Sequence, residues 1–404
     1  MKENGHRARA RHRAEILARL RPGRPASRGE LVRETGLSPA TVSRITRELV
    51  RGRVLREIPP SAPAVGRPLR GLEINADAGA VAGVSILYPA VRVVVLTLRG
   101  DPLAESETPF DPRLGPERLL AVLRNALRQL LRRPETRGGR LRGVGLALPG
   151  QWDRSAGVSR TYPRVPGWHD VPLRGLLERW SGAPATLIGY APALAVAEQA
   201  RGPRPEPRNL LCVEVAENIA LGVLANGEAL EGASGNAGEL GHVVVAPGGP
   251  RCYCGHRGCL ETVATTLAAV ELARRELPRP RPSDYEALVR RATAGDLPAA
   301  RLLARVGRSL GAGLAVALNL LNPERLVLHG RFFAAGDIVL DPIREAIRDH
   351  ALASSWRSLS IERSALGPAA AALGAGLAAI RDALPRLSGG GTAAAPARAG
   401  EASR

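Results

Sequence analysis

The chain has 404 residues, more than one ordinary domain holds, so we expect two or three globular units: a small head and a larger body. Its formal net charge is +19, but Lys2 is the only lysine, and the dominance of Arg, Ala, Gly and Pro suggests a GC-rich coding sequence. No apolar run approaches the roughly 18–20 residues of a membrane span, and no apolar stretch follows the basic N-terminus. Both observations argue against a membrane protein and a signal peptide, and we expect a cytoplasmic protein.

The positive charge is concentrated at the N-terminal end. Residues 1–75 hold 17 basic and 7 acidic side chains, a net charge of +10, and the other 329 residues share the remaining +9. Charge gathered in a short segment is typical of a module that contacts nucleic-acid phosphates.

Three helices are predicted in this head. Apolar residues on one face predict a short amphipathic helix over residues 14–20. Ser27 and Glu30 match a capping box, which begins a second helix. A glycine-containing turn follows, and Ser38, with a proline at the first helical position, begins a third helix over residues 39–51. Two helices joined by such a turn indicate a helix-turn-helix.

The third helix has an apolar face and a polar face. The residues that we expect to face the major groove of DNA are Thr41, Ser43, Arg44 and Arg47. Arginine can pair with guanine or with phosphate, and the two roles differ: mutation relaxes specificity in the first and flattens the salt dependence in the second. Residues 54–58 read as a strand of a β-wing. The head is therefore predicted to be a winged helix-turn-helix domain, and the alternative is a three-helix unit that binds no DNA.

A proline-rich linker, residues 59–72, should be extended and semi-rigid. Its Gly-Arg-Pro run presents Arg67, whose guanidinium can enter a narrow, electronegative minor groove. The alternative is ordinary linker chemistry. At the other end of the chain, the Gly/Ala-rich residues 386–404 are expected to be a disordered tail.

The body alternates strands with helices, which predicts an α/β domain. The clearest segments are residues 81–86, 91–98, 119–131, 143–148 and 173–180. Cys212 lies in a buried-strand pattern and is expected to be a core residue, and Tyr162 and Trp168 are expected to be packing residues.

Three of the four cysteines gather beside one histidine. The ligands that this spacing predicts are His242, Cys252, Cys254 and Cys259. Three thiolates and an imidazole make a closed tetrahedral zinc site of the structural kind. Gly255 and Gly258 allow the sharp turns that the short spacing requires. A disulfide would leave one thiol over, so we expect structural Zn²⁺.

The same segment resembles the ROK family (repressors, open reading frames and sugar kinases), whose mark is Glu-x-Gly-His followed by Cys-x-Cys-Gly-x-x-Gly-Cys-x-Glu. The resemblance covers roughly residues 70–385. It includes Gly-Val-Gly-Leu-Ala-Leu-Pro-Gly at 143–150, Tyr-Pro-Arg-Val-Pro-Gly-Trp at 162–168 and Asn-Leu-Leu-Asn-Pro-Glu at 319–324. It implies a two-lobed body of the actin and hexokinase type, a duplicated ribonuclease H-like unit, behind the winged helix of the repressor branch.

The resemblance also implies a sugar site. By that match Glu239, His242 and Glu261 bind sugar hydroxyls, with the metal pinning the loop that presents them. Alternatively, the two glutamates only support the zinc ligands. The family's Asn-Asp pair, whose aspartate is the catalytic base, aligns with Gly189-Tyr190. Tyr190 could stack on a sugar ring or fill the vacated pocket.

Kinase activity is not expected, because the sequence departs from the kinase pattern at four places. A tyrosine at position 190 is a poor proton acceptor at neutral pH. The two phosphate loops of the family's kinases use glycine amides to approach the phosphates closely. The residues that align with them here, 85–89 and 216–220, contain no glycine. The Leu-Gly-Gly of the kinases' second lobe is replaced by Leu-His-Gly at 328–330.

We therefore predict a DNA-binding transcriptional repressor of carbohydrate-related genes, a homodimer or tetramer that a sugar or sugar derivative releases from a palindromic operator. The second hypothesis is a DNA-binding regulator whose body only dimerises or docks a protein, and a sugar kinase is a distant third. The expected domains are 1–58 (winged helix-turn-helix), 59–72 (linker), 73–188 (N-terminal lobe), 189–385 (C-terminal lobe with the zinc site) and 386–404 (tail).

Overall fold

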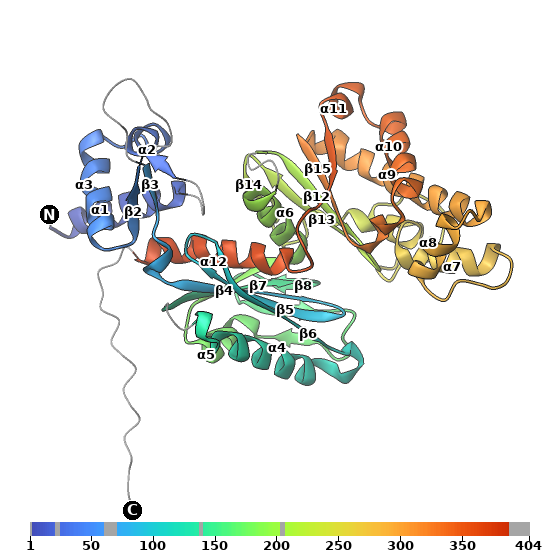
Figure 1. Cartoon of the computed structure of the whole chain (residues 1–404), viewed down its shortest axis with the longest axis horizontal. Helices are drawn as coiled ribbons and strands as arrows, with labels where there is room; N and C mark the ends of the chain where they lie inside the picture. The colour runs from blue at the N-terminus through green and yellow to red at the C-terminus, as the bar shows by residue number, and fades with distance from the viewer. Residues whose placement is uncertain (1, 21–24, 60–70, 137–139, 203–206, 388–404) are drawn as a thin grey trace, which may run out of the picture.

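The structure, a computed structural model, describes residues 2–20, 25–59, 71–136, 140–202 and 207–387. Figure 1 shows a small N-terminal head and two larger lobes, with the head standing at one end of the long helix α12 (Ala370–Leu387). Arg67, most of the expected linker and residues 388–404 lie outside the described residues. Within the described residues, none of the helices combines the length and the apolarity that crossing a bilayer takes.

The helices of the head are α1 (Lys2–Arg19), α2 (Arg28–Thr35) and α3 (Pro39–Arg51). The predicted capping box is confirmed, because Ser27 Oγ accepts from the Glu30 amide at 3.2 Å and the Glu30 carboxylate accepts from the Ser27 amide at 2.7 Å. The predicted start of the first helix is wrong. Its apolar period covers only the last turn, where Ile16 and Leu17 are buried, and α1 extends N-terminally from there through residues without that period.

The wing is a three-stranded sheet in the order β1 (Ala26–Ser27), β3 (Gly71–Ile74), β2 (Leu55–Ile58). β2 confirms the strand predicted at 54–58. Its partner β3 is antiparallel to it and begins inside the range that we expected to be linker, because Leu72 and Ile74 are buried in the core that the head shares with the first lobe. The chain therefore passes from the wing directly into the first lobe.

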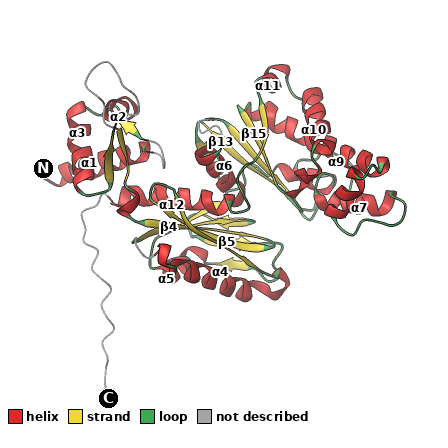
Figure 2. Ribbon diagram, viewed as in Figure 1, coloured by secondary structure: helices red, strands yellow, loops and turns green. Residues whose placement is uncertain are grey.

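The first lobe is a five-stranded sheet in the order β11-β7-β4-β5-β6. The strands are β4 (Ala80–Leu87), β5 (Ala90–Thr97), β6 (Pro102–Pro109), β7 (Leu141–Leu148) and β11 (Ala185–Gly189). Helices α4 (Gly115–Leu131) and α5 (Leu173–Ser181) cover one face and α12 covers the other, as Figure 2 shows. The five predicted body segments correspond to β4, β5, α4, β7 and α5 and are confirmed.

A small sheet beside this lobe joins β8 (Gln151–Asp153), β9 (Val158–Thr161) and β10 (His169–Val171). The packing roles of Tyr162 and Trp168 are confirmed: both are buried, in edge-to-face contact, and Trp168 Nε1 donates to Ser159 Oγ at 2.9 Å.

The second lobe has the strand order β14-β13-β12-β15-β16. The strands are β12 (Leu210–Val215), β13 (Ile219–Ala225), β14 (Glu228–Ala229), β15 (Arg325–His329) and β16 (Ser360–Arg363). In both lobes a central strand, β4 or β12, has two parallel strands on one side and an antiparallel hairpin on the other. This repeat confirms the duplicated unit.

The two faces of the second sheet are covered differently. Helix α6 (Tyr190–Arg201) covers the face on which Cys212 is buried, which confirms Cys212 as a core residue. The other face packs on α7 (Thr266–Glu276), α8 (Tyr285–Thr293), α9 (Leu297–Leu321) and α10 (Asp337–His350), with the short α11 (Ala353–Arg357) beyond them. The lobes meet where α6 crosses α12: a Cβ on Gly374 would overlap the carbonyl oxygen of Ala193.

Candidate functional site

The exposed face of α3 carries the residues predicted to contact DNA. The buried residues of this helix are Val42, Ile45, Thr46 and Leu49. Arg44 and Arg47 are exposed, and Thr41 and Ser43 are half-buried. Arg44 lies 3.7 Å from the carboxylate of Glu48, and Arg47 Nε donates to the Ser43 carbonyl at 3.1 Å. Both guanidinium groups are therefore held along the helix surface and remain open to a ligand.

The four predicted metal ligands come together. One donor atom from each of His242, Cys252, Cys254 and Cys259 lies within 4.8 Å of all the others. Cys254 Sγ lies 3.6 Å from Cys259 Sγ, and Cys252 Sγ lies 3.6 Å from His242 Nδ1. Tetrahedral zinc with bonds of about 2.3 Å to sulfur would separate its sulfur ligands by about 3.8 Å. The cluster can therefore bind a metal, and its dimensions fit zinc.

The loop that carries the ligands is shaped by glycines and short bridges. Gly255 and Gly258 have φ values of 96° and 74°, in the left-handed region, as their predicted role in sharp turns requires. Isolated antiparallel bridges join Val244 to Cys259 and Arg251 to Arg257. These contacts bring residues far apart in the loop around one point.

The thiols lack a common protonation state. Burial, reinforced by Glu261, raises the pKa of Cys252 to about 12. Hydrogen bonding to His256 lowers the pKa of Cys254 to about 6. A divalent cation bound among the sulfurs would lower the pKa values of all three thiols and favour the thiolates.

The predicted sugar-binding residues of this segment surround the metal cluster. Glu261 Oε1 lies 3.2 Å from Cys252 Sγ and 3.7 Å from His242 Nδ1, and its side chain is only 9% exposed. Glu239 lies 3.8 Å from His242 Nε2 and its side chain is 58% exposed. Glu261 therefore contacts the metal ligands directly, whereas Glu239 is available to a ligand from solution.

Tyr253 is a member of this site that we did not predict. Its hydroxyl lies 3.0 Å from His242 Nε2, and the two rings meet edge to face at 5.1 Å. It thus occupies the nitrogen of His242 that faces away from Cys252. Its position between two cysteines is the only sequence signal.

Tyr190 belongs to a different buried cluster from the residues around the metal ligands. It is the first residue of α6, is buried among Ile188, Leu194 and Cys212, and has no hydrogen bond with Glu239, His242 or Glu261 among the described residues. Burial, followed by the carboxylate of Glu214, raises its pKa well above the ordinary value, so the phenol stays neutral.

The segments that aligned with kinase phosphate loops make contacts within the protein. Ser85 is buried in β4, and the ring of Tyr88 lies 5.0 Å from the guanidinium of Arg164. Glu217 forms an ion pair with Arg331, which also pairs with Glu286 at 3.2 Å. Arg331 thus joins the carboxylates of Glu217 and Glu286 in one ion-pair network.

Known proteins resemble both parts of the chain. Residues 89–382 match the ROK family, and residues 14–59 match the IclR helix-turn-helix domain. The N-acetylglucosamine repressor of Escherichia coli O6:H1 is 29% identical over 85% of this chain and 86% of its own length. A ROK family transcriptional regulator, described as a homologue of E. coli Mlc, has a crystal structure that aligns with a TM-score of 0.79 at 25% identity, covering 94% of this chain and 97% of that chain. The ROK hexokinase of Thermus thermophilus aligns with a TM-score of 0.66 at 33% identity, covering 75% of this chain and 98% of that chain.

The two solved structures differ in how much of this chain they cover. The hexokinase aligns with three quarters of the chain, whereas the regulator aligns with nearly all of it. The winged helix-turn-helix followed by a two-lobed body, expected from the motifs, is confirmed. With the family match extending over most of its length, this chain belongs to the ROK family.

Proposed function

We propose that the protein is a cytoplasmic, DNA-binding transcriptional repressor of carbohydrate-related genes, controlled by a sugar or sugar derivative. The observation that carries this proposal is the union in one chain of a basic helix-turn-helix head and a body with an exposed carboxylate beside a metal cluster. The likeness to a protein named as an N-acetylglucosamine repressor supports both halves.

The head supplies the DNA contacts. α3 presents Arg44 and Arg47 to solvent, with Thr41 and Ser43 beside them, and Arg67 is proposed to reach the minor groove. A homodimer, or a tetramer made of two dimers, places two such helices on the half-sites of a palindrome. The exposed arginines also make the affinity depend on salt.

The effector site is proposed at the loop of the metal cluster. Glu239 accepts from the paired hydroxyls of a sugar, and His242 and Glu261 complete the set. The cluster His242, Cys252, Cys254 and Cys259 holds structural Zn²⁺, which pins this loop. Tyr190 contributes from the start of α6 when the lobes close on the ligand.

Phosphoryl transfer is not part of the proposal. The fold is shared with a hexokinase, but Glu217 occupies an ion pair with Arg331 at one phosphate-loop position, and a neutral phenol replaces the catalytic carboxylate at Tyr190. Neither group supports phosphate binding or proton abstraction at neutral pH.

One observation favours a second candidate function. The hydroxyl of Tyr253 holds His242 Nε2 and Tyr190 is buried, so two predicted sugar contacts are occupied by the protein itself. A body that only dimerises or docks another protein would need no free sugar site.

The test measures binding of the zinc-loaded protein to DNA from upstream of its own gene, at fixed salt, with and without a panel of sugars and sugar phosphates. Specific binding that one sugar releases is the expected result. Glu239→Ala should abolish that release and leave DNA affinity unchanged. Glu271→Ala, which alters another exposed glutamate, on α7, should change neither.

Three outcomes would contradict different parts of the proposal. Specific binding that no sugar changes favours the docking function. If Glu239→Ala retains release, the assigned sugar site is wrong. Failure to bind this DNA or a duplex selected from a random library would contradict DNA binding itself.

A further inference from the structure

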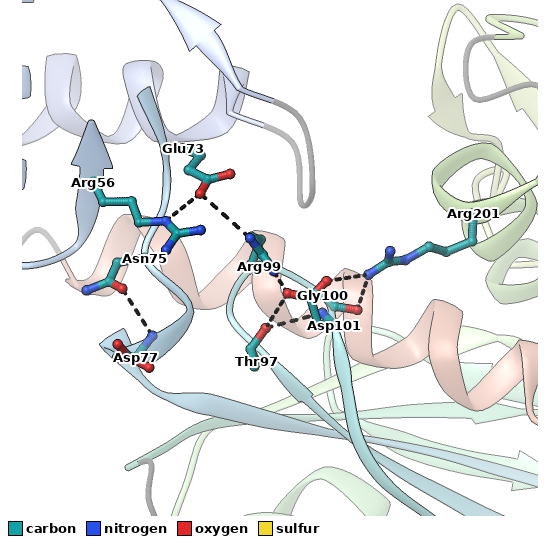
Figure 3. A network of polar contacts seen from close by, with 9 residues as sticks. All are labelled: Arg56, Glu73, Asn75, Asp77, Thr97, Arg99, Gly100, Asp101 and Arg201. Carbon is teal, nitrogen blue, oxygen red and sulfur yellow. Dashed lines mark hydrogen bonds and ion pairs between the residues drawn. The ribbon is translucent and has the colours of Figure 1, made fainter. Parts of the chain in front are cut away.

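We propose that Arg99 and Arg201 are positioning residues for DNA binding, members of a polar relay that ties the angle of the wing to the position of α6. The relay consists of Glu73, Arg99, Gly100, Asp101 and Arg201, and it rests on the proposed DNA-binding function. Figure 3 shows that these residues form a continuous chain of contacts from the wing, across a turn of the first lobe, to the end of α6.

The first end of the relay is a buried carboxylate in the wing. Glu73 on β3 is only 7% exposed and lies directly opposite Arg56 of β2, with which it forms an ion pair. Arg99 Nη1 from the first lobe lies 3.7 Å from the same Glu73 oxygen. Tilting the wing away from the lobe would remove Arg99, one of the cations that compensate this buried charge, and this loss carries a free-energy cost.

The middle of the relay is the rigid turn between β5 and β6. The Thr97 amide donates to the Asp101 carbonyl at 2.9 Å, and the Gly100 amide donates to the Thr97 carbonyl at 2.8 Å. Arg99 Nε donates to Asp101 Oδ2 at 2.5 Å. Although burial opposes the charge, the guanidinium groups of Arg99 and Arg201 hold the pKa of Asp101 below its ordinary value. Backbone and side-chain hydrogen bonds therefore link Thr97, Gly100 and Asp101 and attach Arg99 to the same turn.

The other end of the relay is the last residue of α6. Arg201 donates to the Gly100 carbonyl, and its Nη2 lies 3.5 Å from Asp101 Oδ1. The same helix begins at Tyr190, one of the proposed effector contacts. α6 thus connects the proposed effector site at its first residue to the turn that holds the wing at its last.

The two crossing helices belong to different lobes. A Cβ on Gly83 of β4 would overlap the Ala372 carbonyl, so α12 is seated on the first sheet. A Cβ on Gly222 of β13 would overlap the Ala191 carbonyl, so α6 is seated on the second sheet. Rotation of one lobe against the other would therefore turn α6 against α12, which are in backbone contact at Gly374 and Ala193.

The end of α6 lies far enough from this crossing to move appreciably. From Ala193 to Arg201 the helix rises about 12 Å, so a rotation of about 10° displaces its end by about 2 Å. The Arg201–Asp101 contact, 3.5 Å long, would not survive that displacement in its present form. The angle between the lobes therefore determines whether Arg201 contacts Asp101, and through the relay this contact orients the wing.

The test compares variants of the full-length, zinc-loaded protein on a duplex selected from a random library by the wild type, at fixed salt. The variants are Arg99→Gln, Arg201→Gln and the double variant. The control is Arg113→Gln, which matches Arg99→Gln: each removes one positive charge of the first lobe and leaves an aspartate two residues away without its arginine partner. It also matches Arg201→Gln in the loss of one charge. Each relay variant should weaken binding roughly 3- to 10-fold and the control less than about 2-fold.

The double variant decides whether the residues act together. If the residues act through one series of contacts, breaking two of these contacts should lower DNA affinity no more than breaking one. The double variant should therefore bind DNA as the weaker-binding single variant does. Losses that multiply, or relay variants that bind like the control, would overturn the relay. Equal midpoints of thermal unfolding would show that the variants are folded.

A second measurement needs no DNA and separates this inference from the proposed function. Amide hydrogen exchange in β2 and β3 should accelerate in Arg201→Gln, although Arg201 contacts the turn and not the wing, and stay unchanged in Arg113→Gln. A wild-type protein that selects no duplex would contradict DNA binding. Unchanged exchange in Arg201→Gln would contradict the relay.

Discussion

Cys259 is the ligand whose replacement should affect the metal cluster most, because it is fully buried whereas Cys254 is exposed. Serine offers a poor zinc ligand in place of a thiolate, and a structural zinc contributes its binding free energy to folding. We expect Cys259→Ser to lose the bound zinc and to lower the midpoint of thermal unfolding. Metal content per chain, measured by atomic absorption after dialysis, checks this.

The matched control for this substitution is Cys212→Ser, which also alters a fully buried thiol but lies in β12, outside the cluster. The Cys212→Ser protein should retain its zinc, even if the substitution lowers the free energy of unfolding. One zinc per chain in Cys259→Ser, or none in the wild type, would rule out the proposed ligand set.

Single residues were predictable where their partners are close in sequence. The metal ligands share one short segment, so their spacing alone indicated a common site. The contact of Tyr253 with His242 was not predicted, because a single aromatic residue in a loop forms no recognisable sequence pattern. Arg99 and Glu73 are further apart in sequence and belong to different parts of the fold, and only the folded chain shows that they meet.

Among the elements, the crossing of α6 and α12 depends on one glycine. Gly374→Ala would place a methyl group on the Ala193 carbonyl, and relieving that overlap should destabilise the protein by about 1–3 kcal/mol. Gly175→Ala is the control, because its methyl group would project from α5 into open space and should stabilise the protein by about 0.5–1 kcal/mol. Urea unfolding of both variants measures the difference.

The sign of the two effects is the decisive result. If both alanine variants were stabilised, the helices would have to tolerate a wider separation, and Gly374 would not mark the point about which the lobes turn. Opposite signs would support that assignment.

Elements with local signals were predicted well, and those that depend on distant partners were not. The caps at Ser27 and Ser38 begin α2 and α3 as expected, because each cap bonds within its own first turn. The early start of α1 carries no apolar period, and β3 becomes a strand by pairing with β2 across the segment between them. Neither feature has a strong local signal.

At the scale of the whole molecule, the duplication came from family resemblance rather than from the residues. The two sheets share a strand order, but their strands differ in sequence. A strand needs only alternating polar and apolar residues, or a continuous apolar run, to occupy a given position in a sheet, so many sequences suit the same position. The sequence pattern therefore predicted an α/β body, the family resemblance predicted its two lobes, and the strand order of the two sheets confirmed them.

The head and the first lobe are joined by a shared apolar core, which predicts that they are stabilised together. Leu17 and Ile45 of the head belong to one buried cluster with Leu96 of β5 and Ile380 of α12. Ile380→Ala should cost about 2–5 kcal/mol and should lower amide protection in α3 as well as in β5.

Leu310→Ala is the control, because this fully buried residue of α9 lies in the separate core of the second lobe. It should lower protection in the second lobe and leave α3 unchanged. If Ile380→Ala lowered protection in β5 alone, the head would be an independent unit, and movement of the first lobe could reach the head only through the residues that join β3 to β4. Loss of protection in both elements would mean that α3, the proposed recognition helix, rests on the same core as the first lobe and must move together with that lobe.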